Sequence, residues 1–140
     1  MNLEPIELDL RSDMIPDSLR VHTLCEHFER RDGVIVQVVT SRRKQELADA
    51  QYSAEVFAEL ARGQKRLLLV DMRVPFSTGP GVREFYASQE ANRFVKGMAL
   101  LIASDTGRMI GNFFLKLNRP PSPCRMFTRP RSALEWLHSL

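Results

Sequence analysis

The stretch "RLLLVDM", residues 66–72, decides the fold of this chain. Its apolar residues follow one another without alternating polar positions, which is typical of a parallel strand covered on both faces. A second run of this kind, "MALLIAS", occupies residues 98–104. Because such strands need helices on both faces of their sheet, we expect an α/β fold in which these two strands are central neighbours.

The segments before this stretch predict a hairpin and a long helix. Residues 21–28 and 34–40 are rich in β-formers, and the Asp-Gly pair in the intervening "RRDG" is a hairpin turn signal. Apolar or small residues then recur at helical spacing through residues 41–63. Ser41 is the expected N-cap of this helix, and Gly63 is expected to end it.

The segments after it continue the alternation of helices and strands. Helical patterns are expected from Pro80 through a restart at Ser88, over residues 104–117, and over residues 129–140, with a short last strand in "CRMFT", residues 124–128. The predicted order is therefore ββαβαβαβα. This order predicts a five-stranded mixed sheet with four main helices, joined by right-handed crossovers.

Length and composition predict one ordinary globular domain. The chain has 140 residues, of which 44% are hydrophobic and 26% are charged, and its formal net charge is +3. This mild excess of positive charge is compatible with an acidic partner, but it is weaker than the signature of a dedicated nucleic-acid binder. We therefore expect no nucleic acid as a partner.

Cysteine usage and hydropathy indicate the compartment. Cys25 and Cys124 form no CxxC pair, which favours buried free thiols over a disulfide or a zinc site. No basic, apolar leader opens the chain, and no run approaches the roughly 18 apolar residues of a membrane span. We expect a cytoplasmic protein with no membrane span and no cofactor.

Residues 1–18 are predicted to be an N-terminal arm, and residues 19–140 the domain. The arm carries five acidic residues against the single Arg11. A frayed terminus is one interpretation, and an arm docked on this chain or exchanged with a neighbour is the other. The second interpretation depends on apolar side chains that disorder does not require, namely Leu8, Leu10, Met14 and Ile15.

Three strings carry a resemblance to a known family: "LLLVDMR" (67–73), "FYASQEANRFVKGMALLIAS" (85–104) and "RMIGNFFLKLNRPPSPCRMFTRPRSALEWL" (108–137). They resemble the SpoIIAA-like or STAS-like proteins, whose relatives include the anti-sigma-factor antagonists. The likeness extends over about residues 34–137. It implies a small α/β sandwich without catalytic activity, which serves in signalling as a docking surface for a kinase or regulator.

The resemblance also singles out the corner after the first buried strand. In the antagonists, a hydroxyl that begins the next helix is phosphorylated, and the corresponding positions here are Ser77, Thr78 and Gly79. The acid that precedes the serine in the family is absent. Three interpretations stay open: Thr78 or Gly79 caps a helix, a hydroxyl is a phosphorylation switch, or the helix start binds an anion. A P-loop is excluded because Pro80 removes an amide donor and no lysine follows the glycines.

Three further groups are candidate sites. Asp71 and Arg73 follow the strand at the edge where α/β sheets open their binding crevice, which makes Asp71 the best-placed carboxylate for acid–base chemistry. The simpler interpretation is that Asp71 caps a neighbouring loop or pairs with Arg73. On one strand, Cys25 and His27 share a face while His22 is expected to face the other, so at most two ligands converge and no metal site is expected. The third group is a run of cations without an acid. It is either a set of solvated charges and helix-end charges that complement the helix dipole, or a face that docks an acidic segment such as the arm's Asp9, Asp13 and Asp17. Its members are Arg108, Lys116, Arg119, Arg125, Arg129 and Arg131.

Together these features favour a non-enzymatic STAS-like interaction or regulatory domain. We expect a homodimer with an unknown regulatory protein as partner and a hydroxyl switch at Ser77 or Thr78. The alternative is a carrier of a small apolar ligand or lipid, of the CRAL-TRIO kind, with its pocket between the sheet and the helix at Met109–Leu117.

Overall fold

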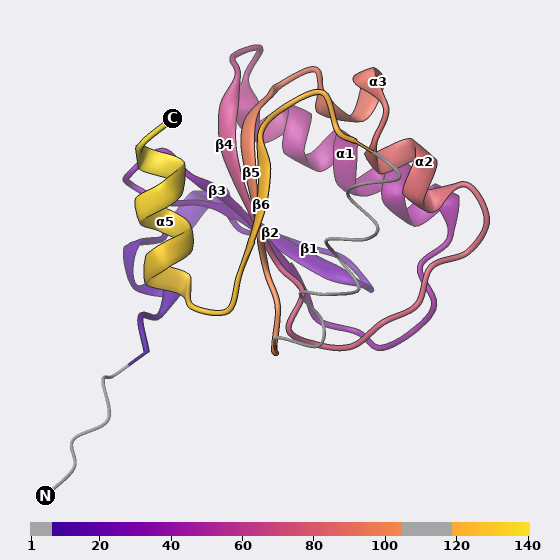
Figure 1. Ribbon diagram of the computed structural model, residues 1–140, viewed down its shortest axis with the longest axis horizontal. Helices are drawn as coiled ribbons and strands as arrows, with labels where there is room; N and C mark the ends of the chain where they lie inside the picture. The colour runs from indigo at the N-terminus through magenta and orange to yellow at the C-terminus, as the bar shows by residue number, and fades with distance from the viewer. Residues whose placement is uncertain (1–6, 105–118) are drawn as a thin grey trace, which may run out of the picture.

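A computed structural model of the chain describes residues 7–104 and 119–140, and its centre is one six-stranded sheet (Figure 1). The strands lie in sequence order, β1 to β6. The first three pair antiparallel, and the pairs from β3 to β6 are parallel. Their bounds are β1 Arg20–Val21, β2 Cys25–Glu29, β3 Ile35–Val39, β4 Arg66–Asp71, β5 Val95–Leu101 and β6 Cys124–Phe127.

The two buried apolar runs are neighbouring central strands, as predicted. Strand β4 pairs in parallel with β5, and Leu68 lies opposite Met98. The expected mixed α/β fold is confirmed, but the strand count is six rather than five. The extra strand arises because residues 21–28 are not one strand: the chain turns after Val21, the His22 N–H donates to the Cys25 carbonyl at 3.0 Å, and β1 folds back on β2.

Helices cover both faces of the sheet. Helices α1 (Leu47–Ala61), α2 (Val82–Tyr86) and α3 (Gln89–Asn92) lie on one face, and α5 (Pro130–His138) lies on the other (Figure 1). Two short 3₁₀ turns, η1 (Leu10–Asp13) and η2 (Pro16–Ser18), precede β1. The helix predicted over residues 104–117 lies outside the described residues, except for Ser104.

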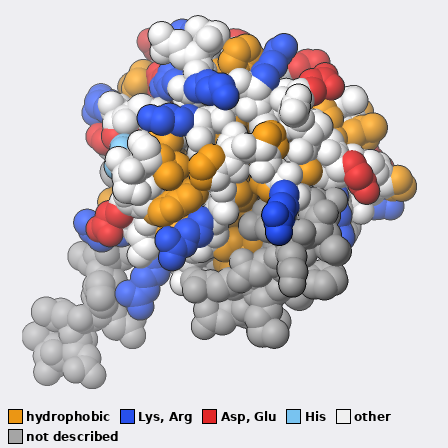
Figure 2. Space-filling model, turned by 45° about the horizontal axis from the view of Figure 1, so that its top comes forward, with side chains coloured by type: hydrophobic (Ala, Val, Ile, Leu, Met, Phe, Trp, Pro, Cys, Tyr) orange, Lys and Arg blue, Asp and Glu red, His pale blue; other side chains and the backbone are white. Residues whose placement is uncertain are grey.

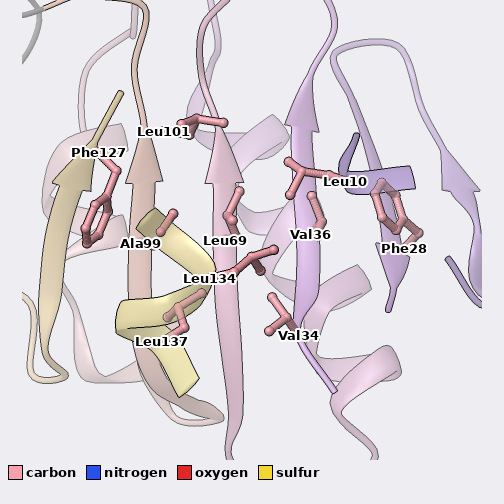
Figure 3. Close-up of a cluster of buried hydrophobic side chains, with 11 residues drawn as sticks. Leu10, Phe28, Val34, Val36, Leu69, Ala99, Leu101, Phe127, Leu134 and Leu137 are labelled. Atoms are coloured by element: carbon pink, nitrogen blue, oxygen red, sulfur yellow. The ribbon is translucent and has the colours of Figure 1, made fainter. Parts of the chain in front are cut away.

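The alternation of side chains along the strands builds a core on each face. On the α5 face, Leu134 and Leu137 lie over the central strands, and Leu10 of η1 joins the same cluster beside Phe28 (Figure 3). The other members of this cluster are Val34, Val36, Leu69, Ala99, Leu101, Phe127 and Ala133. On the α1 face the cluster consists of Ile35, Phe57, Leu60, Ala61, Leu68 and Val95.

Helix α1 begins five or six residues later than the sequence pattern indicates. Its N-cap is Glu46 rather than Ser41, and the Glu46 N–H donates to Oδ2 of Asp49 at 2.9 Å in a capping box. Ser41 instead accepts from the Arg43 N–H at 3.1 Å. Residues 41–46 are therefore a loop, and this loop contributes to the candidate site.

Candidate functional site

Two loops leave the carboxyl ends of adjacent parallel strands and pair with each other. Strand β3 ends at Val39 and β4 ends at Asp71, so their loops emerge at the edge where α/β folds place binding sites. The Gln45 N–H donates to the Ser77 carbonyl at 2.9 Å, and the Gly79 N–H donates to the Gln45 carbonyl at 2.8 Å. This bridge fixes the loop before α1 against the corner after β4.

The corner residues lie on this bridged loop and not at the start of a helix. Ser77 is exposed, Thr78 is half-buried and Gly79 is buried. Helix α2 begins only at Val82, after Gly81, whose φ of 82° is the left-handed conformation that glycine tolerates. The interpretation of Thr78 or Gly79 as helix caps is therefore wrong. An anion at the helix start also loses its physical basis, because α2 has only five residues and a short helix has a weak dipole.

A basic triplet, Arg42–Lys44, lies beside the corner and was missed by the sequence analysis. All three side chains are exposed, and within residues 7–104 and 119–140 none of them forms an ion pair. A methyl group on Gly79 would lie 3.4 Å from Cε of Lys44, so this side chain extends over the corner. The run of three cations was visible in the sequence, but the helix predicted from Ser41 placed it on an ordinary solvated surface.

Substituting Gly79 by alanine tests how tightly the loops are joined. The new methyl group would collide with the carboxylate of Glu46, which belongs to the capping box of α1. We expect Gly79→Ala to lower the free energy of unfolding by about 1 kcal/mol, as the loss of a helix cap does. Urea unfolding measures this. Ser77→Ala on the same loop is the control and should be nearly neutral, and equal stability of the two variants would contradict the packing described.

Asp71 and Arg73 form a closed ion pair rather than an open crevice. Nε of Arg73 donates to Oδ1 of Asp71 at 2.9 Å, and Nη2 donates to Oδ2 at 2.8 Å. This bonding raises the pKa of the Arg73 guanidinium. Glu7 of the arm binds Nη1 at 2.5 Å, above a hollow of about 270 Å³ lined by residues 7–11, Val38 and the ion pair. Both oxygens of Asp71 are engaged, so this carboxylate is poorly placed to act as a general base.

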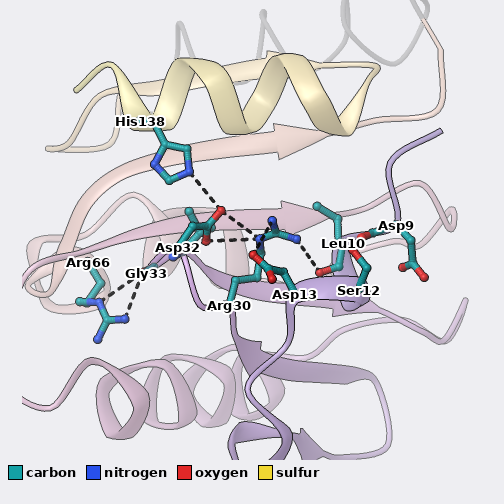
Figure 4. A network of polar contacts seen from close by, with 10 residues as sticks. Asp9, Leu10, Ser12, Asp13, Arg30, Asp32, Gly33, Arg66 and His138 are labelled. Carbon is teal, nitrogen blue, oxygen red and sulfur yellow. Dashed lines mark hydrogen bonds and ion pairs between the residues drawn. The ribbon is translucent and has the colours of Figure 1, made fainter. Parts of the chain in front are cut away.

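The arm is fastened by a buried arginine (Figure 4). Arg30, whose side chain is 7% exposed, donates from Nη1 to the Leu10 carbonyl at 2.7 Å and lies 3.7 Å from Asp13. Its Nε lies 3.2 Å from Oδ2 of Asp32, and Nε2 of His138 lies 3.1 Å from the same oxygen. The network therefore joins the arm, the β2–β3 hairpin and the end of α5. In the described part of the chain the arm's acids pair at Arg30 and Arg73, and none reaches the predicted basic face.

The predicted basic face is only partly described. Arg108 and Lys116 lie outside the described residues. Arg125 lies on β6 over the ring of Phe127, 5.5 Å from its centroid, and Arg119 is exposed. Arg129 and Arg131 lie at the N-terminal end of α5, where the helix dipole opposes positive charge, so the dipole does not explain them. On the face of the molecule seen in Figure 2, Lys and Arg side chains surround a central group of apolar ones, and Asp and Glu lie nearer the margin.

His22, Cys25 and His27 lie together under α1. The rings of His22 and His27 stack with centroids 5.6 Å apart, so the expectation that His22 faces away is wrong. The turn after β1 brings it over His27. His27 is fully buried, and neither ring nitrogen has a hydrogen-bond partner among the described residues. Burial lowers the pKa of His27 to about 4 and raises the pKa of Cys25, which accepts from Nε2 of Gln37 at 3.7 Å. Within the described ranges, no three His, Cys, Asp or Glu side chains are placed to share a metal ion.

Comparison with solved structures identifies the class of fold. An uncharacterized protein of the DUF3478 family from Shewanella loihica PV-4, described as having a SpoIIAA-like fold, superposes with a TM-score of 0.61 at 12% sequence identity. The match covers 86% of this chain and 94% of that one. The fold is therefore SpoIIAA-like, as the resemblance implied. A protein of unknown function from Arthrobacter sp. FB24 is 23% identical over 81% of this chain and 99% of its own. Its TM-score of 0.28 is too low to indicate a shared fold.

The family follows from the sequence. The chain belongs to the family described as a domain of unknown function, DUF7793, whose model matches residues 28–140. No curated protein matches the chain. In residues 7–104 and 119–140, no helix has the length and apolar character needed to cross a bilayer.

Proposed function

We propose that this chain is a non-enzymatic protein-interaction or regulatory domain, with Ser77 or Thr78 as a hydroxyl switch. One observation carries the proposal: the exposed Ser77 lies on a loop that backbone hydrogen bonds fasten to Gln45. A modifying enzyme can reach this side chain. The loop holds it in a fixed place on the surface, so a change of charge there acts on a defined contact area.

A phosphate on either hydroxyl would change the surface charge that a partner protein meets. A phosphoryl group adds up to two negative charges and three acceptor oxygens. Next to Arg42, Arg43 and Lys44, it would turn a positive part of the surface into a neutral or negative one. Because a partner selected by charge responds to such a reversal, modification would change which proteins bind.

Two observations favour binding over catalysis. Asp71, the best-placed carboxylate of the sequence analysis, is bound to Arg73 through both oxygens. His27, a potential base, is fully buried, so its ring is not exposed to a substrate in the described structure. These features support the non-enzymatic proposal.

Mass spectrometry of the native protein tests the switch directly. We expect phosphate on Ser77 or Thr78, and we expect Ser77→Asp or Thr78→Asp to change the set of proteins captured in a pull-down. Ser132→Asp, on the exposed side of α5, is the matched control and should leave the captured set unchanged. An unmodified native chain whose three variants all capture the same proteins would refute the switch.

The other expectations stay predictions. The homodimer and the regulatory partner are untested by the structure. The carrier alternative needs an apolar pocket against residues 109–117, which lie outside the described part. Two hollows in the described part of the chain are lined partly by charged side chains, which does not favour an apolar ligand there.

A further inference from the structure

We infer that the basic triplet Arg42–Lys44 and the hydroxyls of Ser77 and Thr78 form one binding surface for an acidic protein segment. This inference rests on the proposed function only in that both place the partner at the carboxyl edge of the sheet. It does not require any modification of the hydroxyls.

The geometry brings the two groups together. Gln45, which follows the triplet, is bonded on both sides to the corner, through the Ser77 carbonyl and the Gly79 N–H. Lys44 extends over Gly79. Lys44 therefore lies beside the corner that carries the hydroxyls, and the exposed Arg42 and Arg43 precede it on the same bridged loop. Charged and neutral donors of this kind bind carboxylates.

The charge of the triplet is not used within the described chain. The other cations near the carboxyl edge are engaged: Arg73 binds Asp71 and Glu7, and Arg11 binds Glu26. Arg42, Arg43 and Lys44 have no such partner in the described residues, and the acid beside them, Glu46, belongs to the capping box of α1. Three adjacent like charges repel one another, so they destabilise the loop slightly unless an outside anion binds.

An acidic protein segment fits this surface better than a nucleic acid does. Nucleic-acid sites commonly neutralise about six to ten phosphates or stack bases on exposed aromatic rings. The triplet supplies three cations. Phe76, the aromatic residue next to the corner, packs inward against the cluster of Leu24, Cys25 and Val39.

Fluorescence anisotropy with a labelled deca-glutamate peptide at low ionic strength tests the inference on the full chain. The triple variant Arg42→Ser, Arg43→Ser, Lys44→Ser should bind about tenfold more weakly, as the loss of three exposed charge contacts implies. The matched control removes the same charge elsewhere, through Arg125→Ser, Arg129→Ser and Arg131→Ser, and should bind like the wild type. Thermal unfolding followed by circular dichroism verifies that both variants are folded.

The remaining outcomes overturn the inference. Equal weakening in both triple variants would show attraction to net charge alone, and weakening in the control only would place the surface at α5. No binding by the wild type, or tighter binding of a labelled ten-residue oligothymidylate, would also refute it. Failure here leaves the hydroxyl switch standing, because that is decided by mass spectrometry of the native protein.

Discussion

Acidification from pH 7 to pH 4 should lower the free energy of unfolding by roughly 3 kcal/mol through His27. The side chain is fully buried, and burial lowers its pKa from 6.5 to about 4, with a smaller contribution from the neighbouring His22. At a pH between these two pKa values, the unfolded chain therefore binds a proton on His27 and the folded chain does not. This stabilising contribution is complete above the unfolded pKa of 6.5 and is lost progressively as the pH falls towards 4.

Urea unfolding measured across this pH range, with a matched pair of variants, isolates the effect. His27→Gln removes the titrating group, so its free energy of unfolding should fall less steeply with acidification than that of the wild type. Gln51→Ala, at an exposed and uncharged position of α1, is the control. It should follow the wild-type pH dependence closely. If His27→Gln and the wild type lose stability in parallel from pH 7 to pH 4, His27 does not titrate as described.

Replacing Arg30 by methionine should cost about 3 kcal/mol of folding stability and release the arm. Methionine preserves much of the side-chain volume but leaves the Leu10 carbonyl without its donor and Asp32 without its arginine partner. Because Leu10 is part of the α5-face core, loosening it also exposes apolar surface.

The neighbouring arginine supplies the control for this experiment. Arg31 is exposed, and Arg31→Met should change stability by less than about 0.5 kcal/mol. Urea unfolding gives the stability, and limited proteolysis reports the arm: residues 7–18 should be cut faster in Arg30→Met only. If the arm of Arg30→Met resists proteolysis and the variant has wild-type stability, Arg30 does not hold the arm in place.

The central fold was predictable because its signals are local. The apolar runs at residues 67–72 and 98–103 favoured covered parallel strands, and in the structure they are neighbours. Strand β1 was missed because the turn from His22 to Leu24 contains no glycine or proline. The late start of α1 was also missed. Ser41 is a good cap in isolation, but Gln45 is held by the backbone of Ser77 and Gly79, far away in sequence.

The site was predictable only where its partners are close in sequence. The Asp71–Arg73 pair spans two residues and was foreseen as the simple interpretation of Asp71. Arg30 looked like a solvated turn residue, and its burial depends on an arm 20 residues away. The docked arm itself was foreseen as an alternative from its apolar residues, but among the described residues its acids pair with Arg30 and Arg73, which the sequence did not single out as acceptors.

The contact between Asp32 and His138 has a consequence for biosynthesis. His138 meets a hairpin made 106 residues earlier, and Leu134 and Leu137 close the same side of the sheet. Until α5 is made, a ribosome-bound chain therefore leaves the α5 face of its apolar sheet uncovered, and this is the stage at which slow, long-range folding is most exposed to aggregation. Chains truncated before α5 would be substrates for chaperones or proteases, even though the loops at the carboxyl edge of the sheet are complete.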